Sequence, residues 1–112
     1  MIIENNDLKG LKSELSHLDA VTESLGFVRW QWEYYRATYD WKLEMDGQEY
    51  YLRVNTRAIE GKLESPSAVL ELQDAYIGRA TFPHGLEYES AVPDSVRKQA
   101  EEKLKQLKDK LS

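Results

Sequence analysis

The spacing of apolar residues changes twice along this chain of 112 residues, and each change marks a different kind of structural element. In the N-terminal segment the apolar residues recur every three or four positions, as they do on one face of a helix. They are Leu8, Leu11, Leu15, Leu18, Val21 and Leu25. Asn6 or Asp7 can cap the start of this helix, and Gly26 stands where a helix often ends. The spacing predicts a helix over about residues 7–25, with a short edge strand over residues 1–3 before it.

After this helix the apolar residues recur at every second position, which is the period of a strand with one buried face. Residues 29–34 and 38–45 both alternate in this way. Asp46 and Gly47 then give the strongest short signal for a type I′ hairpin turn, because both positions of that turn need a positive φ. A third strand is predicted over residues 49–59, with its apolar side chains on one face.

The second half of the chain holds further strand signals and then returns to helical spacing. Residues 68–72 and 75–82 predict a fourth and a fifth strand, joined by a turn at Gln73-Asp74. A proline and a glycine predict a loop over residues 83–91. From Pro93 onward the apolar residues again recur every three or four positions, which predicts a second helix.

The order of these elements indicates an α+β fold, with one domain over residues 1–112. The predicted sheet is an antiparallel meander of four or five strands with one apolar and one polar face. Each helix has a single apolar stripe. The N- and C-terminal helices are therefore expected to pack together on one face of the sheet.

The segment Phe27–Trp41 carries all three tryptophans and seven of the twelve aromatic residues of the chain. Strand alternation predicts that most of these side chains face the helices and belong to the core. The residues expected there are Trp30, Trp32, Tyr34, Tyr39 and Trp41. The competing interpretation is an aromatic platform for nucleic-acid bases or for sugars. For a nucleic acid the charge is wrong, since residues 27–57 carry five basic and five acidic side chains. We expect no nucleic-acid partner, because such a groove needs a basic excess.

Composition narrows the class of protein further. The chain has no cysteine, which excludes a disulfide framework, a thiolate zinc site and a cysteine nucleophile. Domains that fold without disulfides are common in the reducing cytoplasm, so a cytoplasmic localisation is expected. The N-terminal residues lack the basic and then apolar pattern of a signal peptide. No apolar run approaches the roughly 20 residues of a membrane span, so no membrane contact is expected.

Signals for catalysis are weak in this sequence. His17 lies on the flank of the predicted first helix, and His84 stands in the predicted loop with Glu87 and Glu89. The spacing of these three loop residues matches no established metal-ligand pattern. No serine or threonine stands in a glycine-rich elbow beside a base. The sequence names no catalytic, metal or cofactor-binding residue. A non-enzymatic protein without a cofactor is expected, and an enzyme stays open as an alternative that no residue pattern supports.

The predicted third strand carries a second row of side chains that point away from the helices. They are Tyr51, Arg53, Arg57 and Ile59. Aromatic residues and arginine are enriched in the centres of protein interfaces, so we expect a homodimer or another protein partner on this face. The arginines can pair with acids of a twofold mate, such as Asp40 or Glu44. The alternative is a small-molecule-binding protein with an aromatic pocket between helices and sheet, for a ligand that the sequence does not identify.

Five short motifs follow one another along the chain. They are Leu25-Gly26-Phe27, Trp32-Glu33-Tyr34-Tyr35, Tyr39-Asp40-Trp41-Lys42, Tyr51-Leu52-Arg53-Val54 and Gly61-Lys62-Leu63-Glu64-Ser65-Pro66. Together they resemble the YugN-like family of small proteins from low-GC Gram-positive bacteria, with Asn55 where the family pattern has proline. The resemblance implies an α+β fold. It implies no catalytic residues, because the function of that family is uncharacterised.

Overall fold

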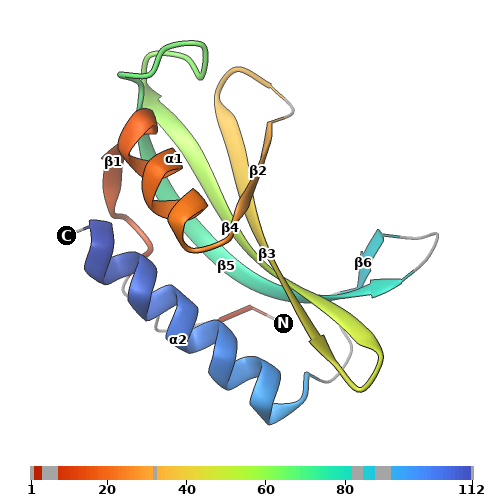
Figure 1. Ribbon diagram of the computed structural model, residues 1–112. Coiled ribbons are helices and arrows are strands. Elements are labelled where there is room, and N and C mark those ends of the chain that lie inside the picture. The colour runs from red at the N-terminus through yellow and green to blue at the C-terminus, as the bar shows by residue number, and fades with distance from the viewer. Residues whose placement is uncertain (1, 4–7, 32, 82–84, 88–91, 112) are drawn as a thin grey trace.

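Figure 1 shows the computed structural model, which describes residues 2–3, 8–31, 33–81, 85–87 and 92–111. Its elements are β1 (Lys12–Glu14), α1 (Leu15–Ser24), β2 (Val28–Gln31), β3 (Arg36–Met45), β4 (Gln48–Glu60), β5 (Val69–Thr81), β6 (Gly85–Glu87) and α2 (Asp94–Leu111). The strands form an antiparallel sheet in the order β1-β5-β4-β3-β2, and β6 pairs with the last residues of β5. Both helices lie on the same side of the sheet (Figure 1), so the predicted α+β fold is confirmed.

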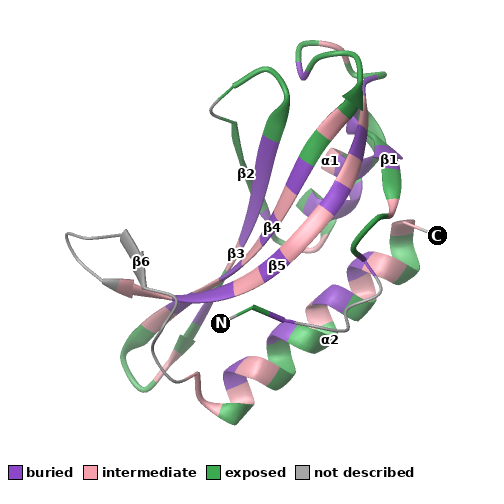
Figure 2. Cartoon of the chain, turned by 180° about the vertical axis from the view of Figure 1, so that it is seen from behind, coloured by how far each residue is buried: buried purple, intermediate pink, exposed green. Residues whose placement is uncertain are grey.

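Helices and sheet share one hydrophobic core. Leu18 of α1, Leu104 of α2 and Leu52 of β4 are all buried in the same cluster. Along β4 buried residues alternate with more exposed ones from Tyr50 to Thr56, as the period of two predicts (Figure 2). The more exposed residues of β4 therefore lie on the sheet face that the helices leave uncovered.

The predicted first helix is wrong in its N-terminal half, where the chain pairs with the sheet instead. A turn at Leu8–Gly10 and the strand β1 precede α1, and β1 pairs with β5. Gly10 has a φ of 91°, which interrupts a helix there. Its N–H donates to the Leu72 carbonyl at 2.8 Å, and the Leu72 N–H donates to the Leu11 carbonyl at 2.8 Å. Leu8 still reaches the core, so its spacing reflects burial rather than a helix.

The end of α1 fixes which residues of β2 face the helices. Gly26 has a φ of 91°, and its N–H donates to the Glu23 carbonyl at 3.0 Å. The Phe27 N–H donates to the Thr22 carbonyl at 2.9 Å, which completes a Schellman motif and confirms the predicted role of Gly26. Phe27 is buried, and alternation along β2 then turns Arg29 toward α1.

The prediction that the aromatic cluster belongs to the core is wrong for two of its members. Trp30 lies on the sheet face away from the helices, and 47% of its surface is exposed. Tyr34 lies in a bend beyond the end of β2 and is also exposed. Tyr39 is buried and Trp41 packs against the core, as predicted. Trp32 lies outside the described residues.

The two predicted turns have different outcomes. Asp46 (φ 51°) and Gly47 (φ 77°) join β3 to β4, which confirms the predicted hairpin. The turn predicted at Gln73-Asp74 is wrong, because β5 runs unbroken through both residues. The register of β5 against β4 shifts at that point, between Val54 and Thr56, so the polar pair forms a β-bulge rather than a turn.

The remaining predictions concern the edge of β5 and the last helix. The loop predicted over residues 83–91 is wrong at 85–87, which form β6, and its other residues lie outside the described ones. The predicted N-terminal edge strand corresponds to an isolated bridge from Ile2 to Tyr76, and the Ile3 N–H donates a 2.9 Å hydrogen bond to β5. The predicted C-terminal helix is confirmed as α2.

Candidate functional site

The face of the sheet opposite the helices, here called the outer face, carries one row of residues across its full width. This central row consists of Val28 on β2, Asp40 on β3, Arg53 on β4, Tyr76 on β5 and Ile2, each paired with the next. Residues directly opposite each other on antiparallel strands point to the same face, so the five side chains are neighbours. Figure 2 shows the sheet from this side, with α1 behind the strands.

The centre of the central row is an ion pair that the chain satisfies by itself. Arg53 donates from Nε to Asp40 Oδ1 at 2.8 Å and from Nη2 to Asp40 Oδ2 at 2.9 Å. Only 6% of the Asp40 side chain is exposed, against 26% for Arg53. Two parallel hydrogen bonds between a guanidinium and a carboxylate form the strongest type of ion pair. In the neighbouring row the Thr38 hydroxyl donates to Asn55 Oδ1 at 3.3 Å, so the centre is both neutral and hydrogen-bonded.

Apolar side chains stand at both ends of the central row. Val28 is 58% exposed at one end and Ile2 is 53% exposed at the other. Trp30, two residues along β2 from Val28, adds an exposed indole on the same face. Scattered exposed apolar residues are ordinary, but here they flank a neutral centre on a single sheet face.

The two ends of the strands carry opposite charges on this face. At one end Arg36 lies directly opposite Arg57, and at the other Glu44 lies directly opposite Glu49. Lys42 stands between the two glutamates, at 3.2 Å from Glu44 and 3.1 Å from Glu49. Its hydrogen bond to Glu49, and then that to Glu44, raises the pKa of Lys42. The face is therefore neutral in its middle. Its basic end carries Arg36 and Arg57, with Glu71 of β5 opposite Arg57, and its acidic end carries the two glutamates around Lys42.

The four residues predicted from the sequence as a possible interface are only partly brought together. Tyr51, Arg53 and Arg57 share the outer face of β4. Ile59 lies at the second register shift between β4 and β5, so strand alternation no longer fixes its direction. Asp40, which the sequence offered as a partner for a twofold mate, is bound within its own chain.

Sequence reasoning missed the apolar part of this surface, Val28 and Trp30. A local signal for it exists. A hydrophobic residue after a helix-ending glycine often contacts the helix, so Phe27 following Gly26 indicates that Phe27 is buried. Counting by two from a buried Phe27 places Val28 and Trp30 on the opposite face.

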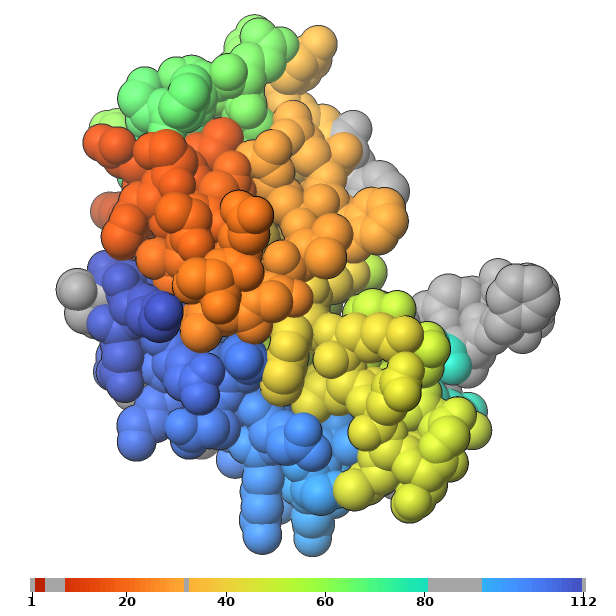
Figure 3. Space-filling view, viewed as in Figure 1, coloured from red at the N-terminus to blue at the C-terminus, as the bar shows by residue number. Residues whose placement is uncertain are grey.

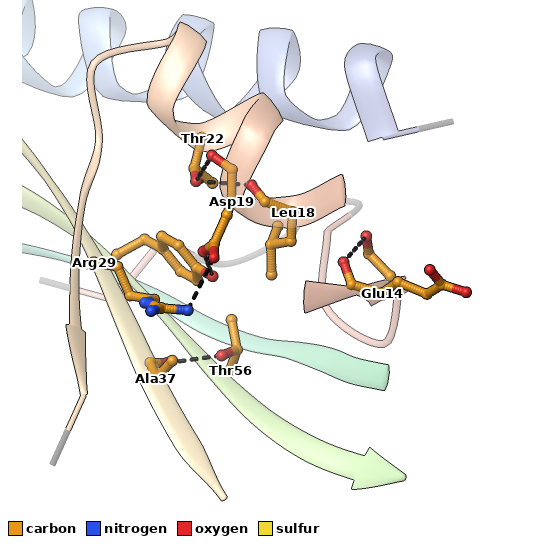
Figure 4. Close-up of polar contacts among 9 residues, drawn as sticks. Glu14, Leu18, Asp19, Thr22, Arg29, Ala37 and Thr56 are labelled. Carbon is orange, nitrogen blue, oxygen red and sulfur yellow. Dashed lines mark hydrogen bonds and ion pairs between the residues drawn. The ribbon is translucent and has the colours of Figure 1, made fainter. Parts of the chain in front are cut away.

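A second polar cluster lies between α1 and the sheet (Figure 4). The Tyr39 hydroxyl donates to Asp19 Oδ1 at 2.8 Å, and Arg29 Nη1 donates to Asp19 Oδ2 at 2.9 Å. Burial, and then the hydrogen bond to Asp19, raises the pKa of Tyr39. Thr22 Oγ1 donates to the Leu18 carbonyl at 2.7 Å within the same helix. Both oxygens of Asp19 are used to hold α1 on β2 and β3, so we assign this cluster a structural role.

A shallow hollow of about 330 Å³ lies between α2 and β3, which are side by side in Figure 3. Its lining consists of Trp41, Lys98, Gln99, Glu102, Lys103 and Gln106. Lys103 Nζ stands 4.3 Å from the centre of a Trp41 ring, within the range of a cation–π contact. The hollow has one aromatic residue in its wall, and the aromatic pocket between helices and sheet that the sequence offered as an alternative stays a prediction.

The predicted loop residues His84 and Glu89 lie outside the described residues, and Glu87 is placed only as part of β6. His17 is an exposed residue of α1. Within the described ranges, no three His, Cys, Asp or Glu side chains are grouped so that they could hold a metal ion. Neither helix in that part of the chain is long and apolar enough to cross a membrane.

Known proteins resemble this chain in sequence and in fold. Residues 4–111 match the YugN-like family. The uncharacterized protein YlbA of Bacillus subtilis (strain 168) is 44% identical over 82 residues, which are 72% of this chain and 68% of that protein. The crystal structure of the uncharacterized conserved protein YugN from Geobacillus kaustophilus HTA426 matches with a TM-score of 0.87 and 38% identity, covering 99% of this chain and 94% of that one. The chain therefore belongs to the YugN-like family.

Proposed function

We propose that this chain is a non-enzymatic, cytoplasmic protein-binding module that self-associates as a homodimer through its outer face. The central row is the observation that carries the proposal. An interface centre must be buried without leaving an unpaired charge, and the bidentate Asp40–Arg53 pair meets that condition. Exposed Val28, Trp30 and Ile2 supply apolar area around it. Tyr51, Arg57 and Ile59 remain proposed contact residues with Arg53.

The outer face has the size that a stable dimer needs. The 10 residues of β3 make a strand about 33 Å long. The central row crosses five neighbouring segments of this chain, β2, β3, β4, β5 and the Ile2 bridge, and at about 4.8 Å spacing these segments span about 24 Å. The face thus offers at most about 800 Å², which is the area that each partner contributes to an interface of standard size.

Sedimentation velocity from low micromolar to near-millimolar concentration tests the proposal. We expect the parent to reach the mass of a dimer as its concentration rises. Trp30→Glu should stay monomeric, because the twofold places an uncompensated charge in the contact twice. Tyr34→Glu is the matched control, since Tyr34 is similarly exposed but lies beyond the end of β2. A parent that remains monomeric throughout overturns the proposal.

The hollow beside Trp41 supports a second candidate function, the binding of a small planar acid. The indole offers a flat apolar surface, and Lys98 and Lys103 offer positive charge beside it. Thermal melting in the presence of aromatic carboxylates tests this candidate. A ligand should raise the melting temperature of the parent at constant mass, and should have less effect on Lys103→Met. Equal shifts in both proteins would exclude the hollow as the binding site.

A further inference from the structure

Four charges on β3 and β4 of the outer face are symmetric about the central row, whereas Lys42 and Glu71 lie outside this symmetry. On β3, Arg36 and Glu44 stand four residues to either side of Asp40. On β4, Arg57 and Glu49 stand four residues to either side of Arg53. The basic end and the acidic end are therefore each about 14 Å from the same line across the sheet. A surface with this symmetry can be complementary to a second copy of itself.

We infer that two copies stack outer face to outer face with their twofold axis along the central row. This inference rests on the proposed function and adds the arrangement of the dimer. A rotation about that line turns each strand end for end while leaving it at the same place across the sheet. Arg57 of one copy then lies over Glu49 of the other, and Arg36 lies over Glu44 of the other. Each dimer contains both kinds of opposite-charge contact twice.

The other simple arrangement places the twofold axis along the strands, between β3 and β4. That rotation keeps each end of the sheet at its own end and exchanges β3 with β4. Arg36 would then meet Arg57 of the second copy, and Glu44 would meet Glu49, so like charges would face each other at both ends. Its one gain would be Asp40 against Arg53 of the second copy, but these groups already form two short hydrogen bonds within each chain.

The charges at the two ends are available for contacts across the dimer, because their present ion pairs, including those of Lys42 with Glu44 and Glu49, are exposed or half-buried. Arg57 is 3.9 Å from Glu71, and Arg36 is 3.4 Å from Glu33 in a more open position. Exposed ion pairs contribute little to stability, so exchanging one partner for another costs little. Charges at the rim of an interface mainly decide which orientation is accepted, which is the role assigned to these four residues.

Two charge reversals on β4 test the arrangement by sedimentation equilibrium. We expect Arg57→Glu to weaken dimerisation about tenfold, because it creates two Glu–Glu contacts per dimer. Glu49→Arg should weaken it similarly through two Arg–Arg contacts. The double variant R57E/E49R should dimerise like the parent. An equimolar mixture of R57E and E49R should form a heterodimer with about the parent affinity, because one copy then carries two acids on β4 and the other carries two bases.

The controls separate failure of this arrangement from failure of the proposed function. Lys105→Glu and Asp109→Arg make the same changes in net charge on exposed positions of α2 and should leave the affinity unchanged. An axis along the strands predicts the opposite sign, since R57E would then pair with Arg36 and tighten the dimer. A parent dimer that R57E does not weaken, or that R57E/E49R does not restore, overturns the arrangement while the proposed function stands. A monomeric parent overturns both.

Discussion

Asp19 and Asp40 lie on opposite faces of the sheet, and an arginine donates to each of them at 2.9 Å or less. Their surroundings differ. Asp19 sits on α1, keeps 37% of its side chain exposed, and binds Arg29 and Tyr39 on two different strands. Asp40 is nearly fully buried and binds Arg53 across the β3–β4 ladder. The first carboxylate connects two layers of the fold, whereas the second connects strands within one layer.

The two faces of the sheet differ in the same way. On the helix side, Leu18, Leu52 and Leu104 belong to one buried apolar core. The hydrogen bonds of the Asp19 cluster add directional contacts between α1 and the sheet. On the outer face, Asp40 is buried and neutralised by Arg53. The outer face therefore holds a buried carboxylate that Arg53 neutralises at its centre.

The largest expected effect is the difference in stability loss between truncating an aromatic residue on the helix side and truncating one on the outer face. Tyr39→Ala should lower the free energy of unfolding by about 3–5 kcal/mol, because Tyr39 fills the core. Trp30→Ala should change it by less than about 1 kcal/mol, since Trp30 is exposed in the monomer. Urea unfolding at a concentration below dimer formation measures both. Equal losses for the two variants would mean that the faces do not differ as described.

Local signals in the sequence predicted much of the fold. They are reliable where no pairing with a distant strand competes with the local structure. Asp46 and Gly47 demanded one type of turn, and Gly26 ended α1 as expected. Leu8 and Leu11 gave a helical spacing that long-range pairing overrode, since the backbone around Gly10 bonds to β5. Pairing with a distant strand leaves no trace in a local period.

The candidate site could likewise be predicted only in part from the sequence. Strand alternation is enough to place Tyr51, Arg53 and Arg57 on one face of β4. The bond between Arg53 and Asp40 was not predictable, because it depends on the register of β3 against β4. The register is set by packing of the whole sheet rather than by residues next to either side chain.

Removal of the outer arginine should have the next largest effect. Arg53→Met leaves Asp40 buried without its partner and should lower the free energy of unfolding by about 3 kcal/mol. The double variant Asp40→Asn, Arg53→Met should recover most of that loss, because no charge is then buried. Asp19→Asn should cost only about 1 kcal/mol, since Asp19 is partly hydrated. Denaturant midpoints rank the three, and a larger loss for Asp19→Asn would reverse the comparison.

A smaller effect is expected from alkaline pH on the helix side. The folded protein raises the pKa of Tyr39 above the value of about 10 that it has in the unfolded chain. Tyr39 therefore contributes its full stability below about pH 10, and the contribution is lost as the pH rises above that value. The parent should lose more stability than Tyr39→Phe between about pH 9 and about pH 11. Parallel losses in the two proteins, which share all other tyrosines, would show that the Asp19–Tyr39 bond does not set this dependence.

The smallest expected effect is an absence of nucleic-acid binding, which tests whether the outer face serves phosphate instead of a second copy. Arg36 and Arg57 make one end basic, but a nucleic-acid backbone that continued along the strands would reach Glu44 and Glu49 about 27 Å further on. We expect no saturable shift of single-stranded or duplex oligonucleotides by the parent in a gel at low salt. Saturable micromolar binding that weakens steeply with added salt would contradict this expectation. In that case Glu49→Arg should strengthen the shift and Arg57→Glu should abolish it, whereas self-association predicts that these variants differ from the parent only in their dimerisation.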